Sequence, residues 1–351
     1  MKRVRSFIVS GAGGVGKTTI SAGIAAALAA ADTEALVLTV DPARRLADAL
    51  GVDLGNEPVP VPGRPNLWAA MLDVTTSWEA IVHHYAAPDV ADRLLVNPFF
   101  RAIADRFPAA QAFAAAEQMA EYIESDHWDV VVIDTPPSGG GIDFFLAPGR
   151  MGDLIGGRLL MWLTGARLPG RRLLYRITAR PMFKLTDAVL GGPLLEDVAE
   201  FLLDLRTMYD ALSVRSKTIR RHLSRATTII VTTADPTPMR ETRRFFQELQ
   251  DVDVSPTGVI FNRSLPPSWA RAARRPVTGV SDPEVRARVR DNLKRWGGEA
   301  RRQEDAREEL ASHHAVPVAT IPWLPDAPTT VDELLAMLEA ADGLGHLGVG
   351  I

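Results

Sequence analysis

Short apolar runs recur along the chain, and longer stretches with helical spacing separate them. We expect these runs to be strands, at residues 3–10, 35–40, 67–73, 130–133, 227–232, 257–262 and 316–321. Runs that stay apolar, instead of alternating with polar residues, are typical of parallel strands covered on both faces. The alanine-rich stretch 19–31 is typical of a helix that crosses between two such strands. The pattern therefore predicts an α/β fold with a mostly parallel, doubly wound sheet flanked by helices.

Two blocks interrupt this alternation, because residues 77–125 and 148–225 have helical spacing throughout. We interpret them as a helical subdomain inserted into the sheet domain. The predicted core comprises residues 1–75, 126–147 and 226–345, and the predicted subdomain comprises residues 76–125 and 148–225. The proline-rich stretches 58–65 and 266–267 are expected to be loops.

Composition narrows the class of protein. The 351 residues are 46% hydrophobic and 23% charged, which is ordinary for a soluble globular chain of one or two domains. The net charge of −4 gives no reason to expect nucleic acid, and the absence of cysteine excludes disulfides and thiolate metal sites. Residues 154–168 are apolar but short and contain two arginines, so we expect no integral membrane segment. With no recognisable signal peptide, a cytoplasmic location is the expectation.

The run SGAGGVGKTT at residues 10–19 carries the most specific chemistry. It matches the phosphate-binding pattern G-x-x-x-x-G-K-[ST], with Lys17 and Thr18 at its end, between a predicted strand and a predicted helix. Backbone N–H groups of such a loop close around phosphates, the lysine neutralises their charge, and the threonine hydroxyl is a hard ligand for Mg²⁺. A plain glycine turn is the alternative. The motif predicts a P-loop NTPase that binds ATP and Mg²⁺, with nucleotide contacts from Gly13, Gly14, Val15, Gly16, Lys17, Thr18 and Thr19.

Two carboxylates follow predicted strands at the edge where parallel sheets bind ligands. Asp134 comes directly after the run VVVI, and we expect it to hold Mg²⁺ directly or through water. Asp41 ends the strand 35–40, where it either orients and deprotonates the attacking water or caps the helix that follows. These two roles of Asp41 are compatible, and the sequence does not separate them.

Three segments together resemble the ArsA-type anion-transporting ATPase family, which includes the arsenical pump ATPase and the ATPase that targets tail-anchored membrane proteins. They are the phosphate loop, DPARRLADA at 41–49 and DTPPSG at 134–139, with weaker matches at 143–148, 233–262 and 322–325. The resemblance implies that Asp41 activates water, that Thr18 ligates Mg²⁺ and that Asp134 supports the metal. It also implies that Asn262 and Pro322 contact adenine. Since the family works as a dimer or as two fused halves, one phosphate loop implies a dimer.

The loop departs from the family at Ala12, where the family has a lysine that reaches the partner's nucleotide. A cation supplied in trans to phosphoryl transfer is worth about 10³ to 10⁵ in rate. Three accounts are open: slow turnover, a paralogous partner chain that carries the lysine, or replacement by Arg44 or Arg45. We expect the chain to be weak as a homodimer and to work best with a partner. Without cysteine, neither the metalloid site of the pump nor the zinc clasp of the targeting ATPase carries over.

Three functions follow. The first is a Mg²⁺-dependent, ATP-hydrolysing dimeric switch that handles an unidentified client or anion. The second, which Ala12 favours, is a weakly hydrolysing regulatory subunit of a heterodimer with a paralogous ATPase. The third is a partitioning or division-type scaffold, against which residues 331–351 argue because they contain no Lys or Arg. A hydrophobic client would bind the apolar stretch 151–168 and residues 182–183, although ordinary helix packing explains the same pattern.

Overall fold

The computed structural model describes residues 4–31, 33–40, 44–106, 108–136, 138–156, 194–252 and 254–350. The chain divides into two compact units. The first comprises Met1–Leu72, Glu121–Ile142 and Ser224–Ile351, and the second comprises Asp73–Ala120 and Asp143–Leu223. Their roles as a nucleotide-binding core and an inserted helical subdomain stay a prediction.

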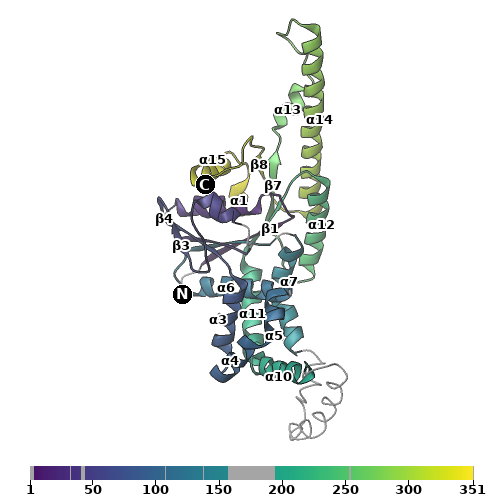
Figure 1. Ribbon diagram of the computed structural model, residues 1–351. Coiled ribbons are helices and arrows are strands. Elements are labelled where there is room, and N and C mark those ends of the chain that lie inside the picture. The colour runs from purple at the N-terminus through teal and green to yellow at the C-terminus, as the bar shows by residue number, and fades with distance from the viewer. Residues whose placement is uncertain are drawn as a thin grey trace. The chain divides into compact units, whose positions relative to one another are not determined.

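A sheet forms the centre of the first unit, and among the described residues its eight strands run in the order β3-β4-β2-β5-β1-β6-β7-β8 (Figure 1). The strands are β1 (Arg5–Gly11), β2 (Ala35–Thr39), β3 (Val59–Val61), β4 (Arg64–Met71), β5 (Val130–Asp134), β6 (Thr227–Thr232), β7 (Gly258–Ser264) and β8 (Val318–Pro322). All neighbouring pairs are parallel except β3 with β4. Every residue of β2 and β5 is buried, which explains why these runs contain no alternating polar positions. The predicted α/β fold of a P-loop NTPase is confirmed.

The register of the central strands brings their carboxyl ends together. Asp134 at the end of β5 lies opposite Val9 of β1 on one side and Thr39 of β2 on the other. The chain leaves β1 for β2 in one direction and later continues to β6 in the other, so the strand order reverses beside β1. Ligands of open α/β sheets bind where the order reverses in this way.

The helices of the first unit are α1 (Lys17–Ala29), α2 (Arg45–Leu50), α12 (Pro236–Gln250), α13 (Pro267–Ala272), α14 (Pro283–His314) and α15 (Val331–Glu339), with a short 3₁₀ helix η1 (Leu344–Leu347). Most of them pack on the sheet, and α13 with much of α14 projects from it (Figure 1). Helix α1 is buried along most of its length and packs against α2 and α15. Its alanines and Gly23 permit this close approach, since a Cβ on Gly23 would lie 3.2 Å from the Leu338 side chain.

The second unit is helical in its described part. Its helices, wholly or in large part, are α3 (Val74–Tyr85), α4 (Pro88–Val96), α5 (Pro98–Arg106), α6 (Pro108–Glu124), α7 (Ser138–Gly156), α10 (Leu194–Thr207) and α11 (Tyr209–Arg225). Trp78 stacks on Phe113 at a centroid distance of 5.8 Å and meets the edge of Phe100 at 5.9 Å. A largely buried ion pair at 2.6 Å joins Arg215 to Glu117. Aromatic packing and a paired charge therefore organise this core.

One predicted loop is a strand. Residues 59–61 of the proline-rich stretch form β3, which pairs antiparallel with β4 at the edge of the sheet. An edge strand tolerates Pro60 because a backbone N–H there has no required ladder partner. Likewise, α13 begins at Pro267, which is favourable because proline fits the first turn of a helix. In the described part of the chain, no helix is long and apolar enough to cross a membrane.

Candidate functional site

The phosphate-type loop joins β1 to α1, and its shape requires glycine. Gly14 and Gly16 have φ of +76° and +96°, in the region that disfavours other residues. Gly11 has φ of +147°, and a Cβ there would lie 2.1 Å from the backbone oxygen of Val231. At Gly11 the loop therefore lies too close to β6 for any side chain, and at Gly14 and Gly16 it has the backbone conformation that favours glycine. Successive backbone N–H groups in loops of this kind form a cradle that binds phosphate.

Lys17 lies over this cradle. It is 7% exposed, and its Nζ donates a hydrogen bond of 2.9 Å to the carbonyl oxygen of Ala12. As the first residue of α1, it stands where the helix dipole also favours an anion. Ala12 itself is 3% exposed and belongs to the hydrophobic core cluster. The loop therefore presents one cation, Lys17, and an apolar side chain at position 12.

Next to the lysine, Thr18 and Asp134 come together although they are far apart in the sequence. Thr18 Oγ1 donates a hydrogen bond of 2.7 Å to Asp134 Oδ2, and Asp134 is fully buried. Thr39 Oγ1, from the end of β2, donates to the same oxygen at 2.9 Å. A hydroxyl and a carboxylate at this distance are the hard oxygen donors that Mg²⁺ takes, so the residues present fit that ion.

Thr39 is a site residue that the sequence did not reveal. It stands in the apolar run 35–40, where a threonine is compatible with any strand. Only the register of β2 beside β5 shows that its hydroxyl supports Asp134.

The segment after β5 is tied to β1 through hydroxyl groups. Thr135 Oγ1 donates to the backbone oxygen of Val9 at 3.1 Å and to Ser10 Oγ at 3.0 Å. Gly141 approaches so closely that an added Cβ would lie 2.6 Å from Ser10 Oγ. Thr135 and Gly141 therefore hold the residues on either side of this segment against β1.

Asn262, at the end of β7, connects to the loop. Its Nδ2 donates a hydrogen bond of 2.8 Å to the backbone oxygen of Val15, and its Oδ1 accepts one of 2.8 Å from the Arg263 N–H. A Cβ on Gly16 would lie 2.5 Å from this Nδ2. The amide therefore fixes β7 against the loop, and contact with a nucleotide base stays a prediction.

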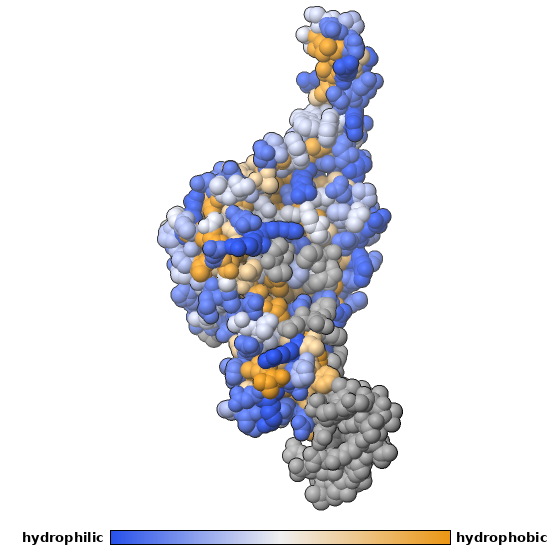
Figure 2. Space-filling model, in the orientation of Figure 1, coloured by the Kyte–Doolittle hydropathy of each residue, from blue (hydrophilic) through white to orange (hydrophobic). Residues whose placement is uncertain are grey.

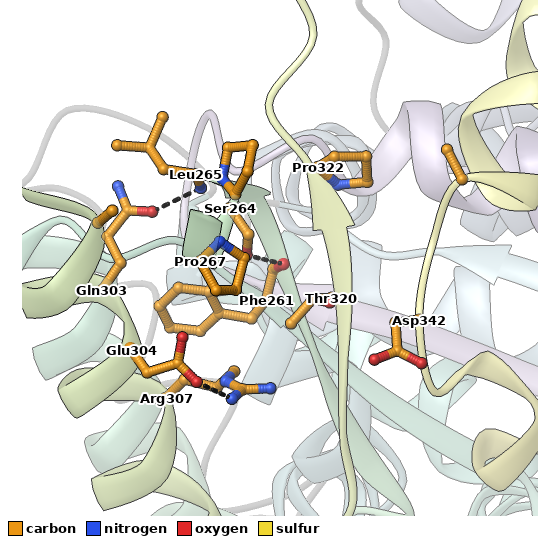
Figure 3. Close-up of a pocket in the computed structure, with 13 residues that line it drawn as sticks. Phe261, Ser264, Leu265, Pro267, Gln303, Glu304, Arg307, Thr320, Pro322 and Asp342 are labelled. Carbon is orange, nitrogen blue, oxygen red and sulfur yellow. Dashed lines mark hydrogen bonds and ion pairs between the residues drawn. The ribbon is translucent and has the colours of Figure 1, made fainter. Parts of the chain in front are cut away.

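Two cavities open at the carboxyl ends of β6, β7 and β8. The smaller, about 250 Å³, is lined by Pro322 together with residues of β7 and α14 (Figure 3). In it, Gln303 accepts a hydrogen bond from the Leu265 N–H, and Glu304 pairs with Arg307. The larger, about 400 Å³, is lined by Thr233, Ala234, Asp235, Arg263, Leu265, Trp269, Trp296, Glu299, Gln303 and Trp323. Its Glu299 is held charged, because a hydrogen bond from Arg302 lowers the pKa of that carboxyl.

Some predicted residues lie outside the described part of the chain. Asp41 is one of them, and so are residues 157–193, which include most of the apolar stretch proposed for a client. Beside Asp41, the first described residues are arginines. Arg44 pairs with Asp53, and Arg45 begins α2 as an exposed residue.

Comparison with known proteins adds independent evidence. A family model described as "Anion-transporting ATPase" matches residues 4–275, a span that contains Lys17, Asp134 and Asn262. An ATPase GET3 from Malassezia globosa is 27% identical over 268 residues, which cover 76% of this chain and 74% of the relative. A second ATPase GET3, from Mycosarcoma maydis, is 26% identical over the same shares. A putative arsenical pump-driving ATPase from Halobacterium salinarum is 36% identical over 149 residues, covering 40% of this chain and 23% of the relative.

Proposed function

Because this chain belongs to the ArsA-type anion-transporting ATPase family, we propose that it is a dimeric, Mg²⁺-dependent switch that couples ATP hydrolysis to the handling of a client or anion. As a member of the family, the chain is an ATPase. The observation that carries the proposal is the meeting of Lys17, Thr18 and Asp134 at the reversal of strand order beside β1.

Each residue has a defined part in this proposal. Lys17 neutralises charge on the β- and γ-phosphates, and loop N–H groups from Gly13 to Thr19 hold the phosphate oxygens. Thr18 and Asp134 hold Mg²⁺, which when bound neutralises the charge that develops on the transferred phosphoryl group. Asp41 orients the attacking water and accepts its proton; this part rests on the family resemblance and on its place after β2.

The base and ribose are proposed to lie beyond the loop, against β7. Asn262 and Pro322 border this region, and the 400 Å³ cavity offers Thr233, Asp235 and Arg263 as polar groups. Aromatic surface from Trp323 in the same cavity suits the face of a purine.

The dimer is proposed to be asymmetric. The buried Ala12 supplies no cation to a partner site. Arg44 pairs with Asp53, whereas among the described residues no acidic group pairs with Arg45, so Arg45 is the better candidate for a substitute. A paralogous chain with lysine at this position would complete the nucleotide site of this chain across the interface. The alternative function is a weakly hydrolysing regulatory subunit. The alanine at position 12 favours it too, because a site without the second cation hydrolyses ATP slowly.

Turnover of purified chain with ATP and Mg²⁺ tests the nucleotide site. We expect Lys17→Ala, Asp41→Asn and Asp134→Asn each to lower kcat by at least about a hundredfold, since each acts on the charge or the water of the transition state. The matched control is Lys217→Ala, which removes an exposed lysine of α11 and should leave turnover unchanged. Full turnover by Lys17→Ala would contradict the proposal.

The variant Ala12→Lys tests whether the chain hydrolyses ATP slowly because position 12 lacks a lysine. If the homodimer is slow because no cation crosses the interface, the variant raises turnover of the chain alone. Brisk hydrolysis by the unaltered chain that Ala12→Lys does not improve would exclude the asymmetric dimer. Affinity purification of Asp41→Asn in the presence of ATP then tests whether a paralogous ATPase co-purifies.

A further inference from the structure

Helices α13 and α14 form a hairpin that projects from the sheet of the first unit (Figure 1). Helix α14 begins at Pro283, beyond residue 275, where the match to the family ends. Along its 32 residues only Gly297, Ala300 and Leu310 are buried. The projecting part of this hairpin, residues 267–298, therefore lies mostly outside the core. Its Trp269 and Trp296 border the 400 Å³ cavity proposed for the nucleotide, and the rest of it needs an explanation of its own.

An apolar groove runs along this hairpin. Val285, Val289, Leu293 and Trp296 recur every three or four residues and so lie on one face of α14. With Trp269 and Ala272 of α13, the last three of them line a cavity of about 280 Å³. Trp296 is 50% exposed and Val285 is 46% exposed, which is high for large apolar side chains.

The groove is preformed, because α13 and α14 touch at a glycine. A Cβ on Gly297 would lie 2.2 Å from the Ala273 Cβ and 2.9 Å from the backbone oxygen of Trp269. Beside this contact, Trp269 meets Trp296 edge to face at a centroid distance of 6.0 Å. A rigid wall of aromatic side chains costs little entropy when a partner binds it.

Charge distinguishes this hairpin from the rest of the chain. Residues 267–298 contain eight basic and three acidic side chains, a net charge of +5, whereas the whole chain has −4. Within the described residues, no acidic group pairs with Arg290 or Arg295, which follow Val289 and precede Trp296 in the sequence. The other basic side chains there without a described acidic partner are Arg271, Arg274, Arg275, Arg286 and Lys294. Figure 2 shows hydrophobic surface bordered by hydrophilic surface at the end of the hairpin.

We propose that this hairpin is a docking site for an acidic amphipathic helix of another protein. The apolar face of that helix lies along α14 and inserts a large side chain between Trp269 and Trp296, while its carboxylates meet Arg290 and Arg295. A second copy of the hairpin is a poor occupant, because two surfaces of charge +5 repel each other. An anionic membrane is the less favoured occupant, because the apolar side chains here line a hollow between two helices, whereas a membrane-binding helix presents one continuous apolar face to the lipid.

A fluorescein-labelled synthetic peptide tests the proposal with the full chain. The probe is a helical peptide with leucine and phenylalanine on one face and glutamate on the other, and its binding is followed by anisotropy. We expect saturable binding that weakens as salt is raised, since charges at the rim are screened. Leu293→Ser should weaken binding about tenfold or more by removing part of the groove floor. The matched control is Leu203→Ser, which alters a partly exposed leucine of α10 and should not change binding.

Charge reversal distinguishes docking from loss of the hairpin. Arg290→Glu with Arg295→Glu should weaken the glutamate peptide and strengthen an otherwise identical peptide that carries lysine, an exchange that unfolding cannot produce. Equal binding of both peptides by the unaltered chain would overturn the proposal, and so would binding that Leu293→Ser leaves unchanged. Binding to phosphatidylglycerol vesicles but not to the peptide would overturn it in favour of a membrane surface. Because no arm uses ATP, failure here leaves the proposed ATPase site untouched.

Discussion

The carboxylate of Asp134 is supported by two hydroxyl groups from different elements, and one of them has no part in the phosphate loop. Thr18 comes from the start of α1, and Thr39 comes from the end of β2. Because Asp134 is fully buried, each donor offsets part of the cost of keeping a carboxylate away from water. The metal site proposed here thus depends on β2 as well as on the loop.

We therefore expect Thr39→Val to weaken the site without changing its shape. Valine has nearly the volume of threonine and suits a buried strand, so the loss is that of one hydrogen bond to a buried carboxylate, about 1–3 kcal/mol. Urea unfolding measures this loss, and the Mg²⁺ concentration for half-maximal turnover should rise. Thr39→Ser keeps the hydroxyl and is the control. Equal stability of Thr39→Val and the unaltered chain would show that this bond contributes nothing.

At the residue scale, the sequence predicted those site residues that stand at fixed positions in a motif or directly after a strand. Lys17 and Thr18 follow from the loop pattern, and Asp134 follows from a carboxylate placed after a buried strand. Thr39 could not be predicted, because a threonine in an apolar run looks the same whether or not its hydroxyl has a partner. The role of Asn262 in holding the loop was also missed, since its bond to Val15 joins residues far apart in the sequence.

At the scale of elements, strands were predicted correctly where their own apolar residues indicate them, and were missed where they form only by pairing with a neighbouring strand. The buried runs that became β2 and β5 are apolar throughout and carry their own signal. Strand β3 has no such signal, because Pro60 argues against a strand and only the neighbouring β4 makes one possible.

The close contact between α13 and α14 at Gly297 predicts opposite effects for alanine at two neighbouring glycines. Gly297→Ala forces a Cβ against Ala273 and should cost about 1–3 kcal/mol in hairpin packing, because backbone lies on the other side of the contact. Gly298→Ala meets nothing within 4 Å and should stabilise the helix by roughly 0.4–1 kcal/mol through the unfolded chain. Hydrogen exchange of residues 267–298 measures both. Similar exchange in the two variants would show that the helices do not touch at Gly297.

The end of α14 makes stability depend on pH. His314 stacks on Phe246 at a centroid distance of 3.8 Å, and burial lowers the pKa of its imidazole, helped by the nearby charges of His313 and Arg243. The unfolded chain therefore takes up a proton at a higher pH than the folded chain does. Stability is full above the unfolded value, about 6.5, and falls as the pH drops through the lower folded value.

The expected result is that His314→Gln makes the free energy of unfolding depend less on pH between about pH 7 and pH 5. Chemical denaturation at several pH values measures this slope. His83→Gln, which alters an exposed histidine of α3, is the control and should keep the slope of the unaltered chain. Arg243 also faces His314 and is itself paired with Glu309 at 2.7 Å. Arg243→Gln should therefore raise the pKa of His314 in the folded chain, so that the fall in stability ends at a higher pH.

At the scale of the whole molecule, the proposed site is incomplete within one chain. Each chain has one phosphate loop, and position 12 of that loop presents a buried methyl group where the proposed dimer would use a cation. If catalysis requires two chains, turnover per chain must depend on protein concentration. ATP with Mg²⁺ should also shift the chain toward dimers, because a ligand that binds one state better favours that state.

We therefore expect turnover per chain to fall when the protein is diluted about a hundredfold at constant ATP, and the fraction of dimer in sedimentation to fall with it. Mixing provides the control. Excess Lys17→Ala chain, inactive at its own site, should restore turnover of dilute unaltered chain, because it still offers its surface and its Arg45 to the partner. Turnover per chain that stays constant on dilution would show that one chain hydrolyses ATP unaided. In that case the nucleotide site of a chain with Ala12 would hydrolyse ATP without a second cation, and no partner chain would be needed to supply one.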